Sequence, residues 1–329
     1  MMSVGIFTRI SLKNGEKVSV TKFKASYTLW IPENIEFALD SKYNDVEISD
    51  FTGNFNFDLY DTDIRAGDFG DNSTFNAKYS SFSIGNGKNV SFDIYDCDVT
   101  GKDLDDVKII TKYSSLTFSS VKSATIQSYD DDFDIQNLTG IQAKASYSSF
   151  LLGGQMKNSG FDLYDSDVKG GSYESLNYSA KYSELIADKI GDLNIDVIYD
   201  CTLKIGNVDD LTCNESKYDD IYLGVAATSI KMPDAYDIQL TVNKLPHTFS
   251  SFPGNFKYGT VTLNADSLLN YRLSCQKTYG SLNYPKERFT NKPSLYIEKD
   301  SKTQFENSTA PDANCEISFT AYDLNFTIK

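Results

Sequence analysis

The stretch Lys78-Tyr79-Ser80-Ser81-Phe82-Ser83-Ile84-Gly85-Asn86 decides the fold, because close variants of it recur along most of the chain. Up to the tyrosine, Phe75, Ala77 and Tyr79 alternate with polar residues, which is the period-two pattern of a β-strand. After the two serines the alternation resumes one step out of phase, and it stops at glycine and asparagine, which favour turns. Each repeat is therefore predicted to contain a strand, a corner over small residues, a second strand and a turn.

Two tyrosine motifs alternate along the chain. The first is Lys-Tyr (once Ser-Tyr), with tyrosines 34 to 36 residues apart at Tyr43, Tyr79, Tyr113, Tyr147, Tyr182 and Tyr218. The second is Tyr-Asp, with tyrosines 34 to 37 residues apart at Tyr60, Tyr95, Tyr129, Tyr164, Tyr199 and Tyr236. Merged, the motifs place a tyrosine every 16 to 19 residues, which indicates a two-unit superperiod of about 35 residues.

The length of the repeat selects the architecture. No window shows the apolar spacing and capping residues of a helix, so an all-β chain is predicted. A propeller blade needs about 40 residues and four strands, whereas each unit here closes in about 17–18 residues. That length suits one coil of a single elongated parallel β-solenoid, in which equivalent positions of successive coils stack into ladders. Because right-handed crossovers dominate parallel β-structure, a right-handed β-helix is expected.

The rhythm of the repeat divides the chain into three parts. Residues 1–24 are predicted to form N-terminal lead-in strands, and residues 25–242 the regular β-solenoid. Residues 243–329 are predicted to form less regular C-terminal coils and a cap, all within one continuous domain. Several prolines interrupt this last part, although Thr278–Leu282 and Thr320–Leu324 keep an echo of the motif.

The phase of the alternation predicts which side chains face the interior. In the strand after the corner, Phe82, Ile84, Phe150 and Leu152 share one phase and are expected to be buried. The repeated tyrosines are expected to stack between neighbouring coils and stabilise the sheet. They also suit a carbohydrate- or protein-binding face, because each ring combines a large contact area with a polar tip. Their persistence along the whole repeat favours the structural role.

Composition narrows the classes of function. The chain of 329 residues has 31 Lys and Arg against 46 Asp and Glu, a formal charge of −15. This charge argues against a nucleic-acid partner, which requires clustered basic residues. No stretch approaches the roughly 20 apolar residues of a membrane span, so no transmembrane segment is expected. The single histidine, His247, makes most histidine-dependent chemistry improbable and is expected to be a loop residue.

The cysteines do not suggest a disulfide scaffold or a zinc site, because none of the five forms a C-x-x-C pair. Cys97 and Cys201 occupy matching places six coils apart, which is beyond bridging distance. Cys275 and Cys315 either meet in the C-terminal region or stay unpaired and buried. The first residues, Met1–Phe7, do not resemble a signal peptide, so the protein is either cytoplasmic or shown in a trimmed form.

The iterated Lys-Tyr-x-x-Φ-x-Φ phrase, followed by glycine or asparagine in an acidic, Tyr- and Ser-rich chain, resembles an adhesin-like β-solenoid family of Bacteroidetes envelopes, the DUF4097-type proteins. The opening Leu29–Asn34 with Ser41–Ile48, and the late Tyr279–Pro285, look like the entry and closing coils of that family. The resemblance covers residues 25 to 329. It implies an exported protein, periplasmic or surface-exposed, and carries no catalytic residues.

The sharpest candidate for a site is the Tyr-Asp-x-Asp cluster. It supplies six carboxylates in equivalent places: Asp61, Asp63, Asp96, Asp98, Asp165 and Asp167. Hard oxygen ligands suit calcium, so a calcium ladder is one interpretation. The favoured interpretation is that these aspartates form turns and solubilise the exterior, without a metal.

Two classes of function follow from these observations. The favoured one is a non-enzymatic scaffold of the cell envelope or surface, adhesin-like by resemblance, with a protein or glycan ligand and no cofactor. The alternative is a carbohydrate-active β-helix enzyme that uses a pair of carboxylates. The acids recur in like surroundings at every second coil, whereas catalysis needs one site with carboxyl groups in unlike environments. A non-enzymatic monomer is therefore expected.

Overall fold

The repeats form a stack of strands in the second of two compact units, Glu33–Lys329, while the first unit is Met1–Pro32. The computed structural model describes residues 28–32, 34–289 and 292–329. The lead-in strands expected at 1–24 lie outside the described residues. In the first unit, residues 28–32 have no regular secondary structure.

The described strands of the regular part are β1 (Phe37–Lys42), β2 (Asp45–Ile48), β3 (Phe55–Tyr60), β4 (Asp63–Ala66), β5 (Ser73–Lys78), β6 (Ser81–Ile84), β7 (Gly87–Tyr95), β8 (Asp98–Lys112), β9 (Ser115–Tyr129), β10 (Asp132–Leu138), β11 (Ile141–Ser146), β12 (Ser149–Leu152), β13 (Gln155–Tyr164), β14 (Asp167–Lys169), β15 (Ser172–Lys181), β16 (Glu184–Tyr199), β17 (Thr202–Lys217) and β18 (Asp220–Leu245). The C-terminal part adds β19 (Ser251–Ala265), β20 (Tyr271–Asn283), the short 3₁₀-helix η1 (Lys286–Arg288), β21 (Leu295–Lys299), β22 (Lys302–Ser308) and β23 (Cys315–Ile328). The described residues contain no α-helix.

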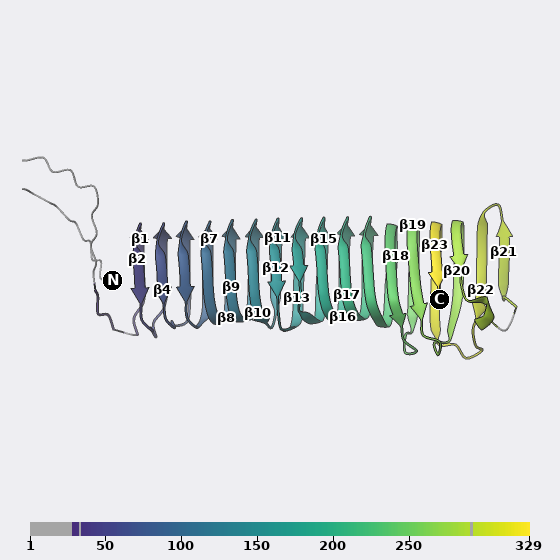
Figure 1. Ribbon diagram of the computed structural model, residues 1–329, viewed down its shortest axis with the longest axis horizontal. Helices are drawn as coiled ribbons and strands as arrows, with labels where there is room; N and C mark the ends of the chain where they lie inside the picture. Colours follow the sequence, from purple (N-terminus) through teal and green to yellow (C-terminus); the bar gives the residue numbers. More distant parts are fainter. Residues whose placement is uncertain (1–27, 33, 290–291) are drawn as a thin grey trace, which may run out of the picture. The chain divides into compact units, whose positions relative to one another are not determined.

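In the regular part, from β1 to β18, each strand pairs in parallel with the equivalent strand one coil further on. The register places Phe75 beside Phe92 and then Phe92 beside Ile109, so equivalent positions stack into ladders. Strands of successive coils lie side by side along the solenoid unit (Figure 1). The prediction of an all-β parallel β-solenoid is confirmed, with about 13 turns of about 18 residues.

The core is a continuous column of apolar side chains, and it is rich in phenylalanine near its start. Phe57, Phe75 and Phe92 are fully buried. Their rings pack between neighbouring coils with centroids 5.5 Å and 5.2 Å apart. Because each coil covers its neighbour, the stack buries apolar surface that a single coil would leave exposed.

The predicted inward phase after the corner is confirmed. Phe82, Ile84, Phe150 and Leu152 are each 3% exposed or less. Tyr79 shares the sequence phase of Phe75 and Ala77 but does not face inward as they do, because its side chain is 45% exposed. Its φ is +55°, and the φ of the equivalent tyrosines before β19 lies between +57° and +61°, which is the left-handed region. The tyrosine itself, and not the serine pair, therefore begins the corner.

Beyond β18, the order of strands in space departs from their order in the chain. β23 pairs in parallel with β19 on one side and with β20 on the other. β20 then pairs with β22, and β22 with β21, in antiparallel fashion. The last strand of the chain therefore fills a coil position between β19 and β20, and the β21–β22 hairpin follows β20 (Figure 1). The motif at 320–324 thus precedes the motif at 278–282 along the stack.

All five cysteines are buried and free. Cys275 lies beside Phe319 in the ladder, and Cys315 lies beside Tyr271. Of the two alternatives for Cys275 and Cys315, the structure has the unpaired, buried one.

Candidate functional site

Every coil turns at one corner, which we call the tyrosine corner, through a residue in the left-handed conformation. This residue is a tyrosine in alternate coils: Tyr43, Tyr79, Tyr113, Tyr147, Tyr182, Tyr218, Tyr258 and Tyr279. In the coils between them it is an aspartate: Asp61, Asp96, Asp130, Asp165, Asp200, Asp237 and Asp323. The two sequence motifs are therefore two ways to build one corner. Aspartate adopts this conformation readily, whereas for tyrosine it costs about 1–2 kcal/mol.

The rings at the tyrosine corner form one continuous ladder. In order along the stack it runs Tyr43, Tyr60, Tyr79, Tyr95, Tyr113, Tyr129, Tyr147, Tyr164, Tyr182, Tyr199, Tyr218, Tyr236, Tyr258, Tyr322 and Tyr279. Neighbouring rings are edge-to-face, with centroids 5.3–5.7 Å apart and interplanar angles of 74–85°. Each such contact contributes about 0.5–1.5 kcal/mol, which offsets the left-handed backbone.

The edge-to-face geometry also bears on whether the ladder binds a ligand. Tyr95, for example, packs against Tyr79 at 5.7 Å and against Tyr113 at 5.3 Å. Each ring inside the ladder contacts both of its neighbours in this way, and the contacts repeat from coil to coil without a break that would mark a local site. This arrangement favours the structural role of the ladder over a binding role.

A buried polar column lies directly behind the tyrosine corner. Each coil contributes the residue that lies two places after the strand leading into the corner. These residues are Thr62, Ser80, Cys97, Ser114, Asp131, Ser148, Ser166, Ser183, Cys201 and Asp219. Ser114 shows the pattern, because its Oγ accepts from the backbone N–H of Cys97 at 3.1 Å and donates to the carbonyl of Lys112 at 3.0 Å. The side chains thus satisfy buried backbone groups at the corner.

Asp131 is a buried carboxyl in this column, and it is fully engaged. Its Oδ1 accepts from Thr111 Oγ1 at 3.0 Å and from the Ser114 N–H at 2.8 Å. Its Oδ2 accepts from Ser128 Oγ at 2.7 Å and from the Tyr129 N–H at 2.8 Å. Burial raises the pKa of Asp131 in spite of these bonds. A carboxyl with four internal donors and 3% exposure is a structural group rather than an acid–base catalyst.

Asp219 is the second buried carboxyl of the column. It accepts from the N–H of Cys201 at 2.8 Å and from Ser216 Oγ at 2.6 Å. Burial is the larger influence and raises the pKa of Asp219 from 3.8 to about 6. The folded protein therefore favours the protonated carboxyl more strongly than the unfolded chain does.

The raised pKa of Asp219 predicts an unusual pH dependence of stability. Its contribution is fully present below pH 3.8 and is lost as the pH rises through about 6. The variant Asp219→Asn has no ionisable side chain at this position. The unfolding free energy of the variant relative to that of the parent should therefore rise by about 2 kcal/mol between pH 4 and pH 8. Urea denaturation across this pH range measures the difference. The exposed variant Asn207→Ala should keep the parental profile, and a flat difference for Asp219→Asn would contradict the prediction.

The six aspartates of the calcium hypothesis lie outside the core at the tyrosine corner. Asp61, Asp96 and Asp165 are exposed left-handed residues. One tyrosine coil separates Asp61 from Asp96, and two tyrosine coils with the Asp130 coil between them separate Asp96 from Asp165. Asp63 and Asp98 begin the following strands, and Ser81 lies between them in the ladder. Within the described residues, no group of three or more acidic, histidine or cysteine side chains is placed to hold a metal ion.

Asp167 is the sixth of these aspartates and has a different environment. It lies beside Glu184 in the ladder. Lys169 Nζ is 3.2 Å from Asp167 and 3.4 Å from Glu184, and Lys204 Nζ is 2.8 Å from Glu184. The two lysines balance the two carboxylates, so this pair has little excess negative charge to attract a cation.

We expect calcium to have little effect on this protein. Asp96→Asn should be neutral or slightly stabilising, because it removes one negative charge from a chain of net charge −15. Millimolar calcium should barely change the melting temperature of parent or variant, since weak sites add almost nothing to stability. Thermal denaturation with and without calcium tests this. A rise of many degrees in the parent that is absent in Asp96→Asn would establish a calcium ladder instead.

A second surface, which we call the polar face, lies on the strands that precede the tyrosine corner. Its central row is Asn56, Thr74, Ser91, Lys108, Thr125, Gln142, Gly160, Asn177, Asn194 and Thr212, all in register. Most of these positions are amides or hydroxyls. The row was not recognised from the sequence, because its members lie 17 or 18 residues apart and share no single residue type.

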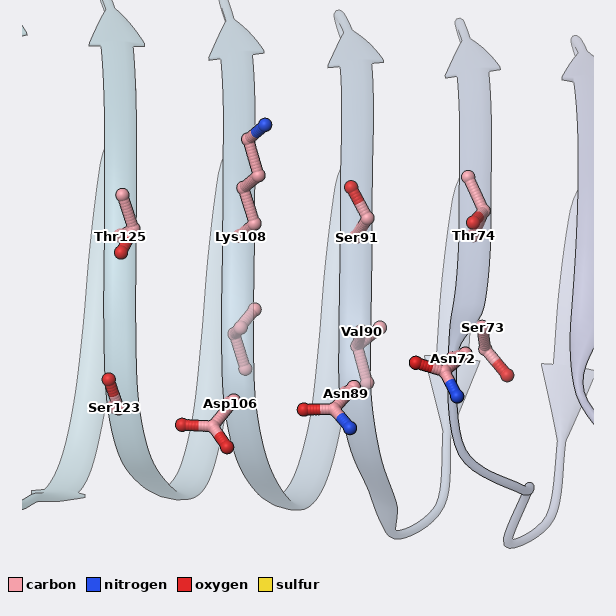
Figure 2. Close-up of a pocket in the computed structure, with 11 residues that line it drawn as sticks. Asn72, Ser73, Thr74, Asn89, Val90, Ser91, Asp106, Lys108, Ser123 and Thr125 are labelled. Carbon is pink, nitrogen blue, oxygen red and sulfur yellow. The ribbon is translucent and has the colours of Figure 1, made fainter.

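Two hollows are set into the polar face, and they share Thr125. The first, of about 420 Å³, spans β5 to β9, where Thr74, Ser91, Lys108 and Thr125 form one row. A second row, Asn72, Asn89, Asp106 and Ser123, flanks it (Figure 2). The second hollow, of about 870 Å³, continues from β9 to β17. Together they extend along most of the regular solenoid.

The remaining candidates do not form a reactive centre. His247 lies in a turn and is exposed, as predicted for a loop residue. Burial raises the pKa of the Cys201 thiol to about 11 and that of the Cys315 thiol to about 12. Thiols that stay protonated are poor nucleophiles, so these two cysteines do not suit nucleophilic catalysis.

Comparison with known proteins found no matching family model, no similar curated protein and no similar solved structure. Membership of the adhesin-like Bacteroidetes family stays a prediction from the motifs. In the described part of the chain, no helix is long and apolar enough to cross a membrane.

Proposed function

We propose that the protein is a non-enzymatic interaction scaffold of the cell envelope or cell surface, adhesin-like, which holds a partner along its polar face. The observation that carries this proposal is the pair of hollows joined at Thr125, which follow the strands of β5 to β17 on one face. A long shallow surface of repeated polar side chains suits an extended partner better than a small substrate, which is usually enclosed in a deep pocket.

The alternative, a carbohydrate-active β-helix enzyme, has less support. Its best location is the acidic hollow of about 250 Å³ around Tyr147, which is lined by Asp130, Asp131, Asp132 and Asp165 among others. Asp131 is the carboxyl there with a raised pKa, as a general acid requires. However, internal donors occupy both of its oxygens, so it is not free to protonate a substrate.

A binding experiment separates the two functions. The full chain, immobilised on beads, is incubated with separated polysaccharide and protein fractions of a bacterial envelope. We expect saturable retention of one fraction, loss of retention in Thr125→Arg, and unchanged retention in Asn207→Arg on another exposed row. The bound material should be released chemically unmodified. New reducing ends or unsaturated sugars in the released material would refute a scaffold and support the enzyme.

A further inference from the structure

We infer that the partner of the polar face is a single extended strand of an uncharged polysaccharide, seated in the larger hollow between β9 and β17. The inference rests on the scaffold function proposed above and specifies its ligand. It is carried by the chemistry of the lining, its charge, its spacing and its shape.

The chemistry of the lining matches sugar hydroxyls. Gln142, Asn177 and Asn194 are exposed and occupy the central row of the larger hollow. Each amide offers both a donor and an acceptor to a pair of neighbouring hydroxyls. Thr125 and Thr212 extend the row at its two ends with hydroxyl groups, which also donate and accept.

The charge of the hollow favours a neutral ligand. The chain has a net charge of −15, yet the charged residues that line the larger hollow are Lys144, Asp162 and Asp196. Lys144 Nζ is 3.1 Å from Asp162, so these two charges balance. An acidic polymer would find no cluster of lysines here, and a basic polymer would find far more negative charge elsewhere on the chain.

The spacing of the row suits a sugar chain. Stacked strands lie about 4.8 Å apart, so the row offers one polar side chain per step of that length. An extended chain of pyranose rings advances by a similar distance per sugar. Successive sugars can therefore meet equivalent side chains, and affinity should grow with the length of the oligosaccharide.

One position of the central row, Gly160, has no side chain, and this affects the shape of the hollow. Gln142 lies over it, since a Cβ added at Gly160 would be 2.3 Å from Gln142 Oε1. The glycine thus leaves room for the amide of Gln142 to lie against the sheet within the row.

A peptide is a poorer occupant than a glycan. Extended peptides usually bind by adding a strand to an open sheet edge, and the polar face presents side chains instead of an edge. Protein partners are held mainly by exposed aromatic and arginine anchors. The exposed residues that line this hollow include neither, because Phe161 and Tyr178 in its floor are buried.

Isothermal titration of the full chain tests the inference. The probes are cellohexaose, mannohexaose and xylohexaose, the corresponding trisaccharides, and an acidic alginate hexamer. At least one neutral hexasaccharide should bind, at least about tenfold more tightly than its trisaccharide and than the alginate hexamer. The double variant Asn177→Ala/Asn194→Ala, and separately Gln142→Ala, should weaken binding at least about tenfold. Asn207→Ala, on another exposed row, should change it less than about twofold.

Several results would overturn the inference: no binding of any neutral hexasaccharide, preference for the acidic hexamer, equal affinity for short and long probes, or unchanged affinity in the variants. These results leave the scaffold proposal separately testable. If the beads retain an envelope protein fraction and Thr125→Arg abolishes that retention, the neutral-glycan inference fails and the scaffold stands. If the beads retain nothing, both fail.

Discussion

Phe150→Ala is expected to destabilise the solenoid by roughly 3–5 kcal/mol. The Phe150 side chain is 0% exposed and lies in the strand after the tyrosine corner. Its ring stacks on Phe133 of the preceding coil at 4.7 Å and meets Phe161 at 5.8 Å. Truncation removes both contacts and leaves a cavity that stacked coils, tied to each other by backbone hydrogen bonds, cannot readily close.

The adjacent residue supplies a matched control for this experiment. Leu151 lies in the same strand but is 54% exposed, so Leu151→Ala should change the unfolding free energy by less than about 0.5 kcal/mol. Hydrogen exchange followed by mass spectrometry is the suitable measurement, because coils that contact only their neighbours lose stability locally. Faster exchange should centre on β10 to β14 in Phe150→Ala. Similar exchange in the two variants would show that the inward phase of this strand is wrong.

The parts of the fold that could be predicted are those set by a fixed spacing along the chain. Tyrosines every 16 to 19 residues were enough to predict parallel coils and the ladder, and the period-two alternation predicted the burial of Phe150. The left-handed backbone at Tyr79 was not predictable, because steric rules favour glycine, asparagine or aspartate there. Its stabilising partners, the rings of Tyr60 and Tyr95, come close only after three coils have stacked.

The polar groups of the site were predictable only in part. The aspartates of the Tyr-Asp motif were correctly expected at a corner, because they recur beside a conspicuous tyrosine. The small residue behind the corner, such as Ser114, recurs just as regularly, but nothing in the sequence says that it accepts from Cys97 in the neighbouring coil. The polar face was missed because a row of mixed amides and hydroxyls appears only when the coils are placed in register.

The position of β23 shows how the alternation of motifs constrains the C-terminal part. β19 and β20 both place a tyrosine, Tyr258 and Tyr279, in the left-handed position. β23 supplies Tyr322 followed by a left-handed Asp323, which is the Tyr-Asp type. Inserted between them, it keeps the two corner types alternating, and Tyr322 packs edge-to-face on Tyr258 at 5.6 Å and on Tyr279 at 5.5 Å. The alternation of the two corner types is therefore a sequence signal for the order β19, β23, β20 along the stack.

Deletion of residues 315–329 is therefore expected to unfold the C-terminal part of the solenoid and to spare the rest. Within β23, five large apolar side chains are 4% exposed or less: Ile317, Phe319, Leu324, Phe326 and Ile328. At about 1.5–3 kcal/mol for each buried side chain, their loss removes on the order of 10 kcal/mol. β20 loses its parallel neighbour, and the β21–β22 hairpin, which pairs only with β20, loses its link to the stack, while β3 to β18 keep their neighbours.

Hydrogen exchange should show this division directly. In the deletion variant, β20 and β22 should exchange freely, whereas β7 to β17 should stay protected, because coils contact only their neighbours. Asn325→Ala, an exposed change within β23, should leave protection unaltered. The opposing outcome is that β20 closes onto β19 and stays protected. Closure would bring Tyr258 and Tyr279, both left-handed, into the same position of adjacent coils. The edge-to-face ladder requires alternating positions, so it could not continue there. Protection of β20 in the deletion variant would therefore show that the alternation of corner types does not determine the order of the C-terminal strands.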